Sequence, residues 1–413
     1  MKAKIIVSML IAGGLISPMA HATNGYFSHG YGMKAKGMAG AGIALPQDSL
    51  AAANNPAGMV MVGDRADLGL DWFEPTRGAD VANAGFLQNG SYQGNEKSEF
   101  FIPEFGYNKM MNPNSSLGVS VYGNGGMNTD YATSPFSASA PGPKAGINLQ
   151  QLFIAPTWAM KINSQHSVGV ALNLVYQTFS ANGLGLFQGS SSNSAAVTDN
   201  GKDTSKGFGY RLGWTGELTS TLTMGATVQP KTHMSKFGKY AGLFAEQGGF
   251  DIPANYGLGI AVKATPQTTI AADYEVIKYG SVPSIANTVS AGGALGTNNG
   301  MGFGWEDVKV IKLGVSQVMS DKLTLRAGYS HNTQPIPASQ TMFNFLAPGV
   351  VQDHVTLGAT WNVSKQNEVT VAYMHAFEKK VNGPGAIPSS FVGGDVNLHM
   401  YQNSLGVAYS WKM

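Results

Sequence analysis

The feature that most constrains this chain is an alternation of apolar residues with small or polar ones, which recurs to the last residue. Leu405, Val407, Tyr409 and Trp411 alternate with glycine, alanine and serine. A period of two is the pattern of a β-strand with two unlike faces. In a water-soluble sheet the second face carries Lys and Glu in quantity, whereas here it carries Gly, Thr, Ser, Asn and Gln. That pattern is typical of strands that face lipid outside and a barrel lumen inside.

Fourteen segments carry this pattern, and most exceed the roughly 9–11 residues that a tilted strand needs to cross the hydrocarbon layer. Tight turns such as 112–115 and 364–367 alternate with long connections such as 183–205 and 281–305. Short turns on one side and long loops on the other are typical of outer-membrane barrels, whose long loops lie outside the cell. We therefore predict an all-β fold, a 14-stranded antiparallel transmembrane barrel spanning 65–413. The expected strands are 65–75, 97–110, 116–127, 148–162, 167–181, 206–219, 221–234, 251–264, 267–280, 306–319, 322–335, 350–363, 367–380 and 396–413.

Composition agrees with a wall that meets lipid. Charged residues make up 12% of the 413 residues, about half the share of an ordinary soluble protein. The net charge of +2 and the lack of a basic run argue against a nucleic-acid partner. There is no cysteine, which excludes disulfide scaffolds, zinc–thiolate sites and thiol catalysis.

The first 22 residues have the form of an export signal. Lys2 and Lys4 precede the apolar run 5–16, and Ala20-His21-Ala22 has the small-x-small form of a cleavage site. The run is shorter than the roughly 20 apolar residues of a spanning helix. We predict a signal peptide at 1–22 that is cleaved, and a location in the outer membrane of a Gram-negative bacterium.

Residues 23–64 lack the alternating pattern of a strand. Glycines punctuate the first half, and the small-residue run 50–53 predicts a short helix with Asp48 or Ser49 as its N-cap. A turn at 54–58 follows. Because this segment is too small to form a core of its own, we expect it to pack inside the barrel as a plug, or hatch.

Aromatic residues recur near the predicted strand ends, where outer-membrane barrels carry aromatic girdles. The residues concerned are Trp72, Phe73, Tyr107, Trp158, Trp214, Trp305, Trp361 and Trp411.

Three cations fall on the inward face of their strands. Alternation places Arg211, Lys312 and Arg326 in the lumen, where they could receive the carboxylate of a ligand. The alternative is that they pair with plug acids such as Asp48 or Asp64, or simply line a wet channel.

The connection 235–250 is unusually apolar for a loop. It carries Phe237, Tyr240, Leu243 and Phe244, and it ends at Phe250. Exposed apolar clusters mark interaction sites, so we interpret these residues as an extracellular capture loop. The alternative is that the loops pack on one another.

Catalytic and metal-binding motifs are missing from the sequence. It contains no G-x-S-x-G, H-E-x-x-H or P-loop, and the mature histidines are scattered without ligand-like spacing. The glycine pattern near Gly40 does not follow a strand of a βαβ unit. We expect no enzyme activity, no cofactor and no metal.

Three stretches together resemble the FadL/TodX family of outer-membrane transporters of long-chain fatty acids and other hydrophobic compounds. Gly37–Gly42 with Asn55-Pro56-Ala57 resembles the hatch motif of that family. The stretches 242–255 and 343–358 resemble two further family blocks, in the same order along the chain. The resemblance covers the mature chain and implies a barrel occluded by the hatch.

The resemblance also implies a route: capture by loops, binding in a luminal pocket, hatch rearrangement, and lateral release beside a kinked third strand. Gly123, Gly125 and Gly126 stand in that strand here, and glycine inside a strand marks a bulge or kink. The expected function is passive, selective uptake of hydrophobic compounds, foremost long-chain fatty acids, by a monomer that contacts membrane lipid and lipopolysaccharide. The alternatives are an aromatic-hydrocarbon carrier of the same family and a general diffusion porin, which should lack the plug.

Overall fold

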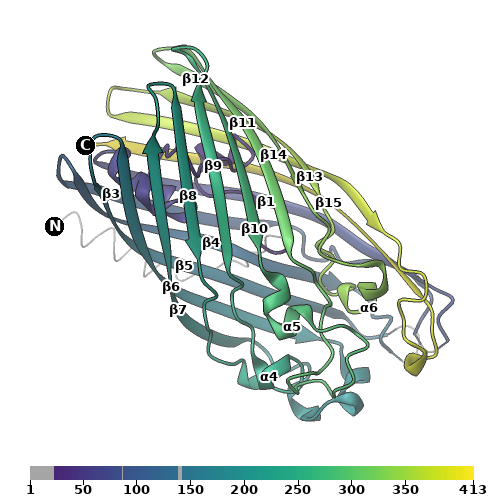
Figure 1. Cartoon of the computed structure of the whole chain (residues 1–413). Coiled ribbons are helices and arrows are strands. Elements are labelled where there is room, and N and C mark those ends of the chain that lie inside the picture. The colour runs from purple at the N-terminus through teal and green to yellow at the C-terminus, as the bar shows by residue number, and fades with distance from the viewer. Residues whose placement is uncertain (1–22, 86, 138–141) are drawn as a thin grey trace.

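The computed structural model describes residues 23–85, 87–137 and 142–413, which form a closed antiparallel barrel of fourteen strands with one short extra strand (Figure 1). The predicted signal peptide lies outside the described residues. The strands are β1 Arg65–Ala82, β2 Gly90–Gln93, β3 Phe100–Asn112, β4 Ser115–Tyr131, β5 Ala145–Lys161, β6 His166–Asn182, β7 Asp203–Glu217, β8 Leu222–Gln229, β9 Asn255–Lys263, β10 Thr268–Ile277, β11 Val308–Ser320, β12 Leu323–Asn332, β13 Asp353–Asn362, β14 Asn367–Val381 and β15 Asp395–Lys412.

Each barrel strand pairs with its neighbours in sequence, and β15 closes the barrel against β1 from Arg65–Lys412 to Ala82–Asp395. The extra strand β2 pairs with the upper part of β1, at Gly78–Val81. The predicted fold class is therefore confirmed. Closure leaves no unpaired edge around most of the wall, as lipid requires.

The wall is apolar outside, as the alternation predicts. Exposed apolar side chains of the outer face include Leu68, Leu70, Phe101, Leu117, Leu172, Leu174, Phe208, Tyr210, Leu258, Ile311, Leu313, Leu357 and Leu405. Their inward neighbours include Asp67, Ser120, Asn173, Arg211, Lys312 and Ser404, which are buried. Two predicted girdle residues differ: Phe73 faces inward and Trp305 lies in a connection, and both are buried.

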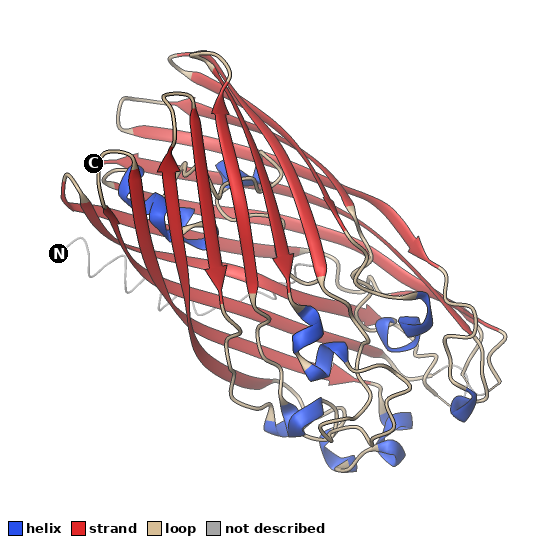
Figure 2. Ribbon diagram, viewed as in Figure 1, coloured by secondary structure: helices blue, strands red, loops and turns tan. Residues whose placement is uncertain are grey.

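Short turns and long connections lie at opposite ends of the barrel, and the C-terminus lies at the short-turn end (Figure 1). The long connections carry the short helices α4 to α6 at the far end, which is the extracellular end by the rule for such barrels (Figure 2). In the described ranges no helix is long and apolar enough to cross a membrane. The helices are α2 Met33–Lys36, α3 Ala51–Asn54, η1 Pro56–Met61, η2 Gly185–Ser190, η3 Ser194–Ala196, η4 Gly238–Tyr240, α4 Ala245–Gly248, η5 Tyr279–Ser281, α5 Pro283–Ala286, η6 Ala338–Gln340, α6 Thr341–Asn344 and η7 Ser389–Phe391.

The N-terminal segment lies inside the barrel and is buried almost throughout residues 23–60 (Figure 2). Its short helix α3 is capped differently from the prediction. Leu50 is the N-cap, and no side chain caps the helix. Instead the Asp48 carboxylate accepts a hydrogen bond from the backbone N–H of Leu50 (3.0 Å).

Strand β8 is shorter than predicted, ending at Gln229 rather than near residue 234. Pro230 follows directly, and proline has no backbone N–H to give to a ladder. The chain continues as a loop that bonds to its two neighbours at single points: Thr232 exchanges backbone hydrogen bonds with Ile252, and the N–H of Ser235 donates to Lys206 O (2.8 Å).

Candidate functional site

Asn55 ties the hatch to the barrel wall. Its Nδ2 group donates to the backbone oxygens of Ile43 (2.8 Å) and Trp214 (2.9 Å), so it joins two parts of the hatch to β7. Its Oδ1 atom accepts from the N–H of Ala57 (3.1 Å), which starts the η1 turn after Pro56. A buried amide with this many partners is expensive to remove. The Asn-Pro-Ala motif therefore has a structural role in seating the hatch.

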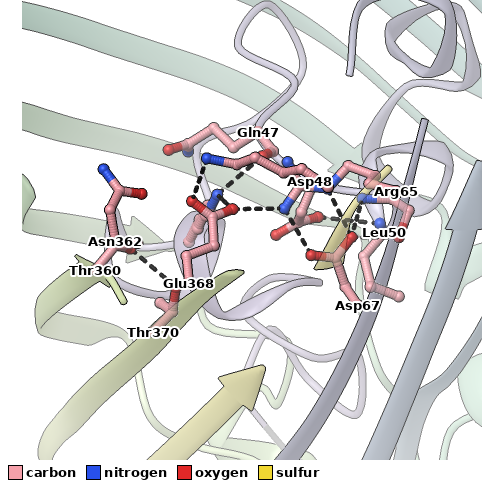
Figure 3. A network of polar contacts seen from close by, with 12 residues as sticks. Gln47, Asp48, Leu50, Arg65, Asp67, Thr360, Asn362, Glu368 and Thr370 are labelled. Atoms are coloured by element: carbon pink, nitrogen blue, oxygen red, sulfur yellow. Dashed lines mark hydrogen bonds and ion pairs between the residues drawn. The ribbon is translucent and has the colours of Figure 1, made fainter. Parts of the chain in front are cut away.

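A buried ion network joins the hatch to the wall (Figure 3). Lys34 Nζ lies 2.5 Å from Glu368 of β14, and Arg65 of β1 lies 2.8 Å from the same carboxylate. Arg65 also lies 2.7 Å from Asp67, which accepts a hydrogen bond from the backbone N–H of Ser49 (2.9 Å). Buried charges of this kind need partners, and here the partners belong to different elements.

Lys36 makes a second ionic link, to Asp71 of β1 (2.8 Å) and Glu104 of β3 (3.6 Å). Arg326 belongs to the same region rather than to a ligand cavity. It donates to Gln47 of the hatch (2.9 Å) and to Thr360 of β13 (2.7 Å). Arg326 is thus a hatch contact in this structure.

Arg211 and Lys312 lie together, in a narrow cavity between the hatch and the barrel wall. Phe27 and Tyr31 of the hatch line it with Glu275 of β10, and its volume is about 20 Å³. Lys312 Nζ lies 2.9 Å from Glu275. The remaining lining residues are Ser28, Ala53, Asn54, Thr227, Asn255, Tyr256 and Ile277.

The partners of Arg211 are neutral in the part of the chain that the structure describes. Its guanidinium donates to Gln229 (3.1 Å) and Asn255 (2.9 Å), and its Nε atom has no hydrogen-bond partner. Two cations and one anion line the cavity, which leaves a net charge of +1. A buried excess cation favours an anionic ligand.

Strands β3 and β4 pair over only part of their length, and the rest of the described seam between them has no ladder hydrogen bonds. Their pairing runs from Asn112–Ser115 to Phe105–Val121, although β4 continues to Tyr131. The β4–β5 register shifts by one residue between Gly123 and Gly125, which is a β-bulge. The predicted glycines therefore lie at a kink on an open strand edge.

The hatch fills this edge with its first residues. The N–H of Ser28 donates to Asn124 O (3.0 Å), and the N–H of Gly126 donates to Tyr26 O (3.0 Å). Gly125 permits the approach, because a Cβ there would lie 1.9 Å from the carbonyl oxygen of Tyr26. Tyr279 clamps the same segment, donating from its hydroxyl to Asn24 O (2.6 Å).

A small apolar pocket of about 30 Å³ lies among the long connections, with Ser284 as the one polar side chain in its lining. Leu243 and Phe244 line it. Phe237, Tyr240 and Phe250 are fully buried beside it, so the loop is packed rather than exposed as expected. Their role in capture stays a prediction. The other lining residues are Ile147, Phe179, Leu184, Phe187, Leu295, Met301, Gly302, Phe303, Phe343 and Leu346.

Sequence reasoning missed the acids that complete these sites. Asp273 and Glu275 alternate with outward Tyr274, so the parity that located the cations would also have located them. Asp273 accepts hydrogen bonds from the backbone N–H groups of Gly42 (2.7 Å) and Ile43 (3.0 Å) of the hatch. Nothing in the sequence indicates that Tyr26–Ser28 would bond to β4, because that contact spans about a hundred residues.

A closed lipid-facing barrel with a hatch in its lumen and apolar space under its loops defines an outer-membrane transport protein. The sequence matches the profile of the outer membrane transport protein family OMPP1/FadL/TodX over residues 15–409. The chain belongs to this family, which consists of transport channels rather than enzymes. Among curated proteins no sequence matches it.

Solved structures share the fold at low sequence identity. The toluene transporter TodX of Pseudomonas putida is 19% identical, with 93% of this chain and 99% of that chain covered and a TM-score of 0.71. A Pseudomonas aeruginosa FadL homologue is 15% identical, with 94% and 99% covered and a TM-score of 0.71. The toluene transporter TbuX of Ralstonia pickettii is 20% identical, with 93% and 99% covered and a TM-score of 0.66.

Proposed function

We propose that this protein takes up long-chain fatty acids by passive, selective transfer across the outer membrane. The observation that carries the proposal is Arg211, a buried cation with neutral partners in a cavity of net charge +1. A carboxylate would satisfy the free Nε–H and neutralise the cavity. The apolar lining of the pocket under the loops matches an acyl chain on its way in, and the pocket must widen to admit it.

The proposed route follows from the placement of these sites. The loops admit the molecule to the apolar pocket, and its carboxylate then reaches Arg211 and Lys312 between the hatch and the wall. Movement of Tyr26–Ser28 away from β4 opens the seam beside Gly125, through which the molecule enters the bilayer. An apolar chain that stays out of water retains roughly 25 cal/mol per Å² of surface, so affinity differences can drive each transfer.

The test compares oleate with oleyl alcohol, which has the same chain without the carboxylate. Arg211→Met and Lys312→Met should each weaken oleate binding to the detergent-solubilised protein by about tenfold, the value of one charge-assisted hydrogen bond, and should change alcohol binding little. Lys309→Met is the matched control, because Lys309 is an exposed residue of the same strand as Lys312. Equal loss for both ligands would reject the carboxylate site.

A second candidate, a neutral aromatic hydrocarbon, is favoured by the lining of the apolar pocket, which contains no charged side chain. Two of the similar structures are also toluene transporters by their own descriptions. If toluene is the cargo, it should bind with the same affinity to wild type and to Arg211→Met.

A further inference from the structure

The barrel wall has a second interruption, between β7 and β8. Their ladder ends at Leu212–Val228, and in the described chain the next bridge is Gly207–Met234. That stretch contains one more residue on the β8 side than on the β7 side, and Pro230 within it has no backbone N–H. β8 is also the shortest of the fourteen barrel strands, with 8 residues. Few ladder bonds therefore hold this part of the wall.

A groove hollows the lipid-facing surface where this ladder ends. Its volume is about 570 Å³, within the size range of small-molecule sites. Ala226 of β8 lies in it among larger outward side chains, and no lining residue is charged. The lining residues are Leu212, Gly213, Trp214, Ala226, Thr227, Val228, Tyr256, Gly257, Leu258 and Tyr274.

The groove lies directly behind the cavity of Arg211. Thr227 and Tyr256 line both spaces, so these two residues form the partition between them. On the inner side, Arg211 Nε, Gln229 Nε2 and Asn255 Nδ2 are buried donors with no hydrogen-bond partner. Buried donors without partners are costly and mark places where a ligand or water completes the site.

The two interruptions are sealed differently. At β3–β4 the backbone of the hatch bonds across the open edge, so the hatch must move before the seam opens. At β7–β8 the side chain of Thr232 covers the interruption: it packs on Gly209, where a Cβ would lie 2.2 Å from Thr232 Oγ1. Backbone hydrogen bonds resume beyond it, where the N–H of Ser235 donates to Lys206 O (2.8 Å). A change of side-chain rotamer is a smaller motion than displacement of the hatch.

We propose that the groove on β7–β10 is an acyl-chain binding site at the membrane end of a passage through the β7–β8 interruption, by which a long-chain carboxylic acid moves between Arg211 and the bilayer. The proposal rests on the proposed function, because it takes the same ligand class. The two ends of the passage fit the two parts of such an acid. The apolar groove outside fits the acyl chain, and Arg211 with its unpaired neighbouring donors inside fits the carboxylate.

Occupancy can be measured directly, because the chain has no cysteine of its own. A fluorophore is placed on Ala226→Cys, and on Ala327→Cys as control, since Ala327 is a half-buried alanine on β12 outside the groove. The proteins are reconstituted into phosphatidylcholine vesicles and titrated with doxyl-stearic acid. Quenching at 226 should saturate and be reversed by oleate, while quenching at 327 should rise linearly. Linear quenching at both positions would overturn the site.

The link to the interior is tested by adding Arg211→Met to the labelled Ala226→Cys protein. Half-saturation of the quenching should then shift to several-fold higher doxyl-stearic acid. An unchanged titration would overturn the passage. Oleate and oleyl alcohol binding to the solubilised Arg211→Met protein is measured separately. An equal loss of binding for the two ligands there rejects the proposed function, whatever the quenching shows.

The role in transfer is tested by filling the groove. Ala226→Trp should slow the transfer of bound oleate from reconstituted protein to acceptor vesicles several-fold, with oleate affinity retained. Ala327→Trp, the same change elsewhere on the lipid-facing wall, should leave the rate unchanged. A wild-type rate for Ala226→Trp would show that the groove is not on the path.

Discussion

The hatch brings three buried charged residues into this barrel, Lys34, Lys36 and Asp48, and the ionisation of Asp48 is the least favourable of the three. It is buried, its carboxylate accepts a hydrogen bond from the Leu50 N–H, and Asp67 lies nearby on β1. Burial, and after it repulsion from Asp67, raises the pKa of Asp48 to about 7, although Arg65 and Lys34 act in the opposite direction. The hatch therefore contains a carboxyl group that titrates near neutral pH.

Because the pKa of Asp48 is raised on folding, its contribution to the stability of the folded protein depends on pH. A raised pKa means that the folded protein binds the proton more tightly than the unfolded chain does. The stabilising contribution is full below the ordinary pKa of 3.8 and is lost as the pH rises through about 7. Asp48→Asn keeps the acceptor for Leu50 and removes the titration. The variant should gain in melting temperature over wild type at pH 8 and not at pH 4, as measured by thermal unfolding in detergent. A constant difference across this range would contradict the assignment.

The sequence predicted which side of each strand a residue faces, because parity is a local property. Arg211, Lys312 and Arg326 are all inward, as alternation requires. It could not predict which of them meet, because height in the barrel depends on strand tilt and register between distant strands. Two cations therefore share a cavity, while Arg326 lies against the hatch.

Among the elements, the strands were largely predictable and their interruptions were not. Period-two alternation predicts all fourteen barrel strands, whereas β2, with the sequence Gly-Ser-Tyr-Gln, forms by pairing with the long upper part of β1. The kink of β4 was predicted from its glycines. The hatch segment that fills it was not, because nothing local marks a contact between Tyr26 and Gly126.

The ion network predicts that the hatch depends on one carboxylate of β14. Glu368→Gln leaves Lys34 without the anion that lies 2.5 Å away, and removing one partner of a buried pair costs about 3–5 kcal/mol. Thermal unfolding should show a marked loss of stability. Glu378→Gln is the control on the same strand, since Glu378 forms an exposed pair with Lys380 (3.7 Å) worth about 0–1 kcal/mol. Similar losses for the two variants would contradict the role of the network.

We expect one added methyl group to break the contact between the hatch residues Tyr26–Ser28 and the open edge of β4. In Gly125→Ala the added Cβ would lie 1.9 Å from Tyr26 O, so the first hatch residues must leave β4. Hydrogen exchange of the Ser28 and Gly126 amides should accelerate by at least tenfold. The control is Gly189→Ala, because a Cβ at Gly189 meets no atom within 4 Å. Unchanged exchange in Gly125→Ala would show that this contact does not seal the seam.

At the scale of the whole molecule, the barrel is a wall around a filled interior. The hatch residues 23–60 are buried almost throughout, and aromatic side chains occupy much of the space above them. The part of the chain that the structure describes therefore leaves small polar solutes no wide aqueous path. Liposomes that contain the intact protein should swell in arabinose no faster than protein-free liposomes, in contrast to a general porin. Rapid swelling would reject the plugged conduit.

The central claim is that this conduit carries a long-chain carboxylic acid. The most direct measurement is the uptake of radiolabelled oleate, at limiting concentration, by cells that lack their own fatty-acid carrier. The account predicts that this chain restores uptake, and that Arg211→Met, present at the same level in the outer membrane, restores far less. Restored uptake of toluene with no uptake of oleate would contradict it.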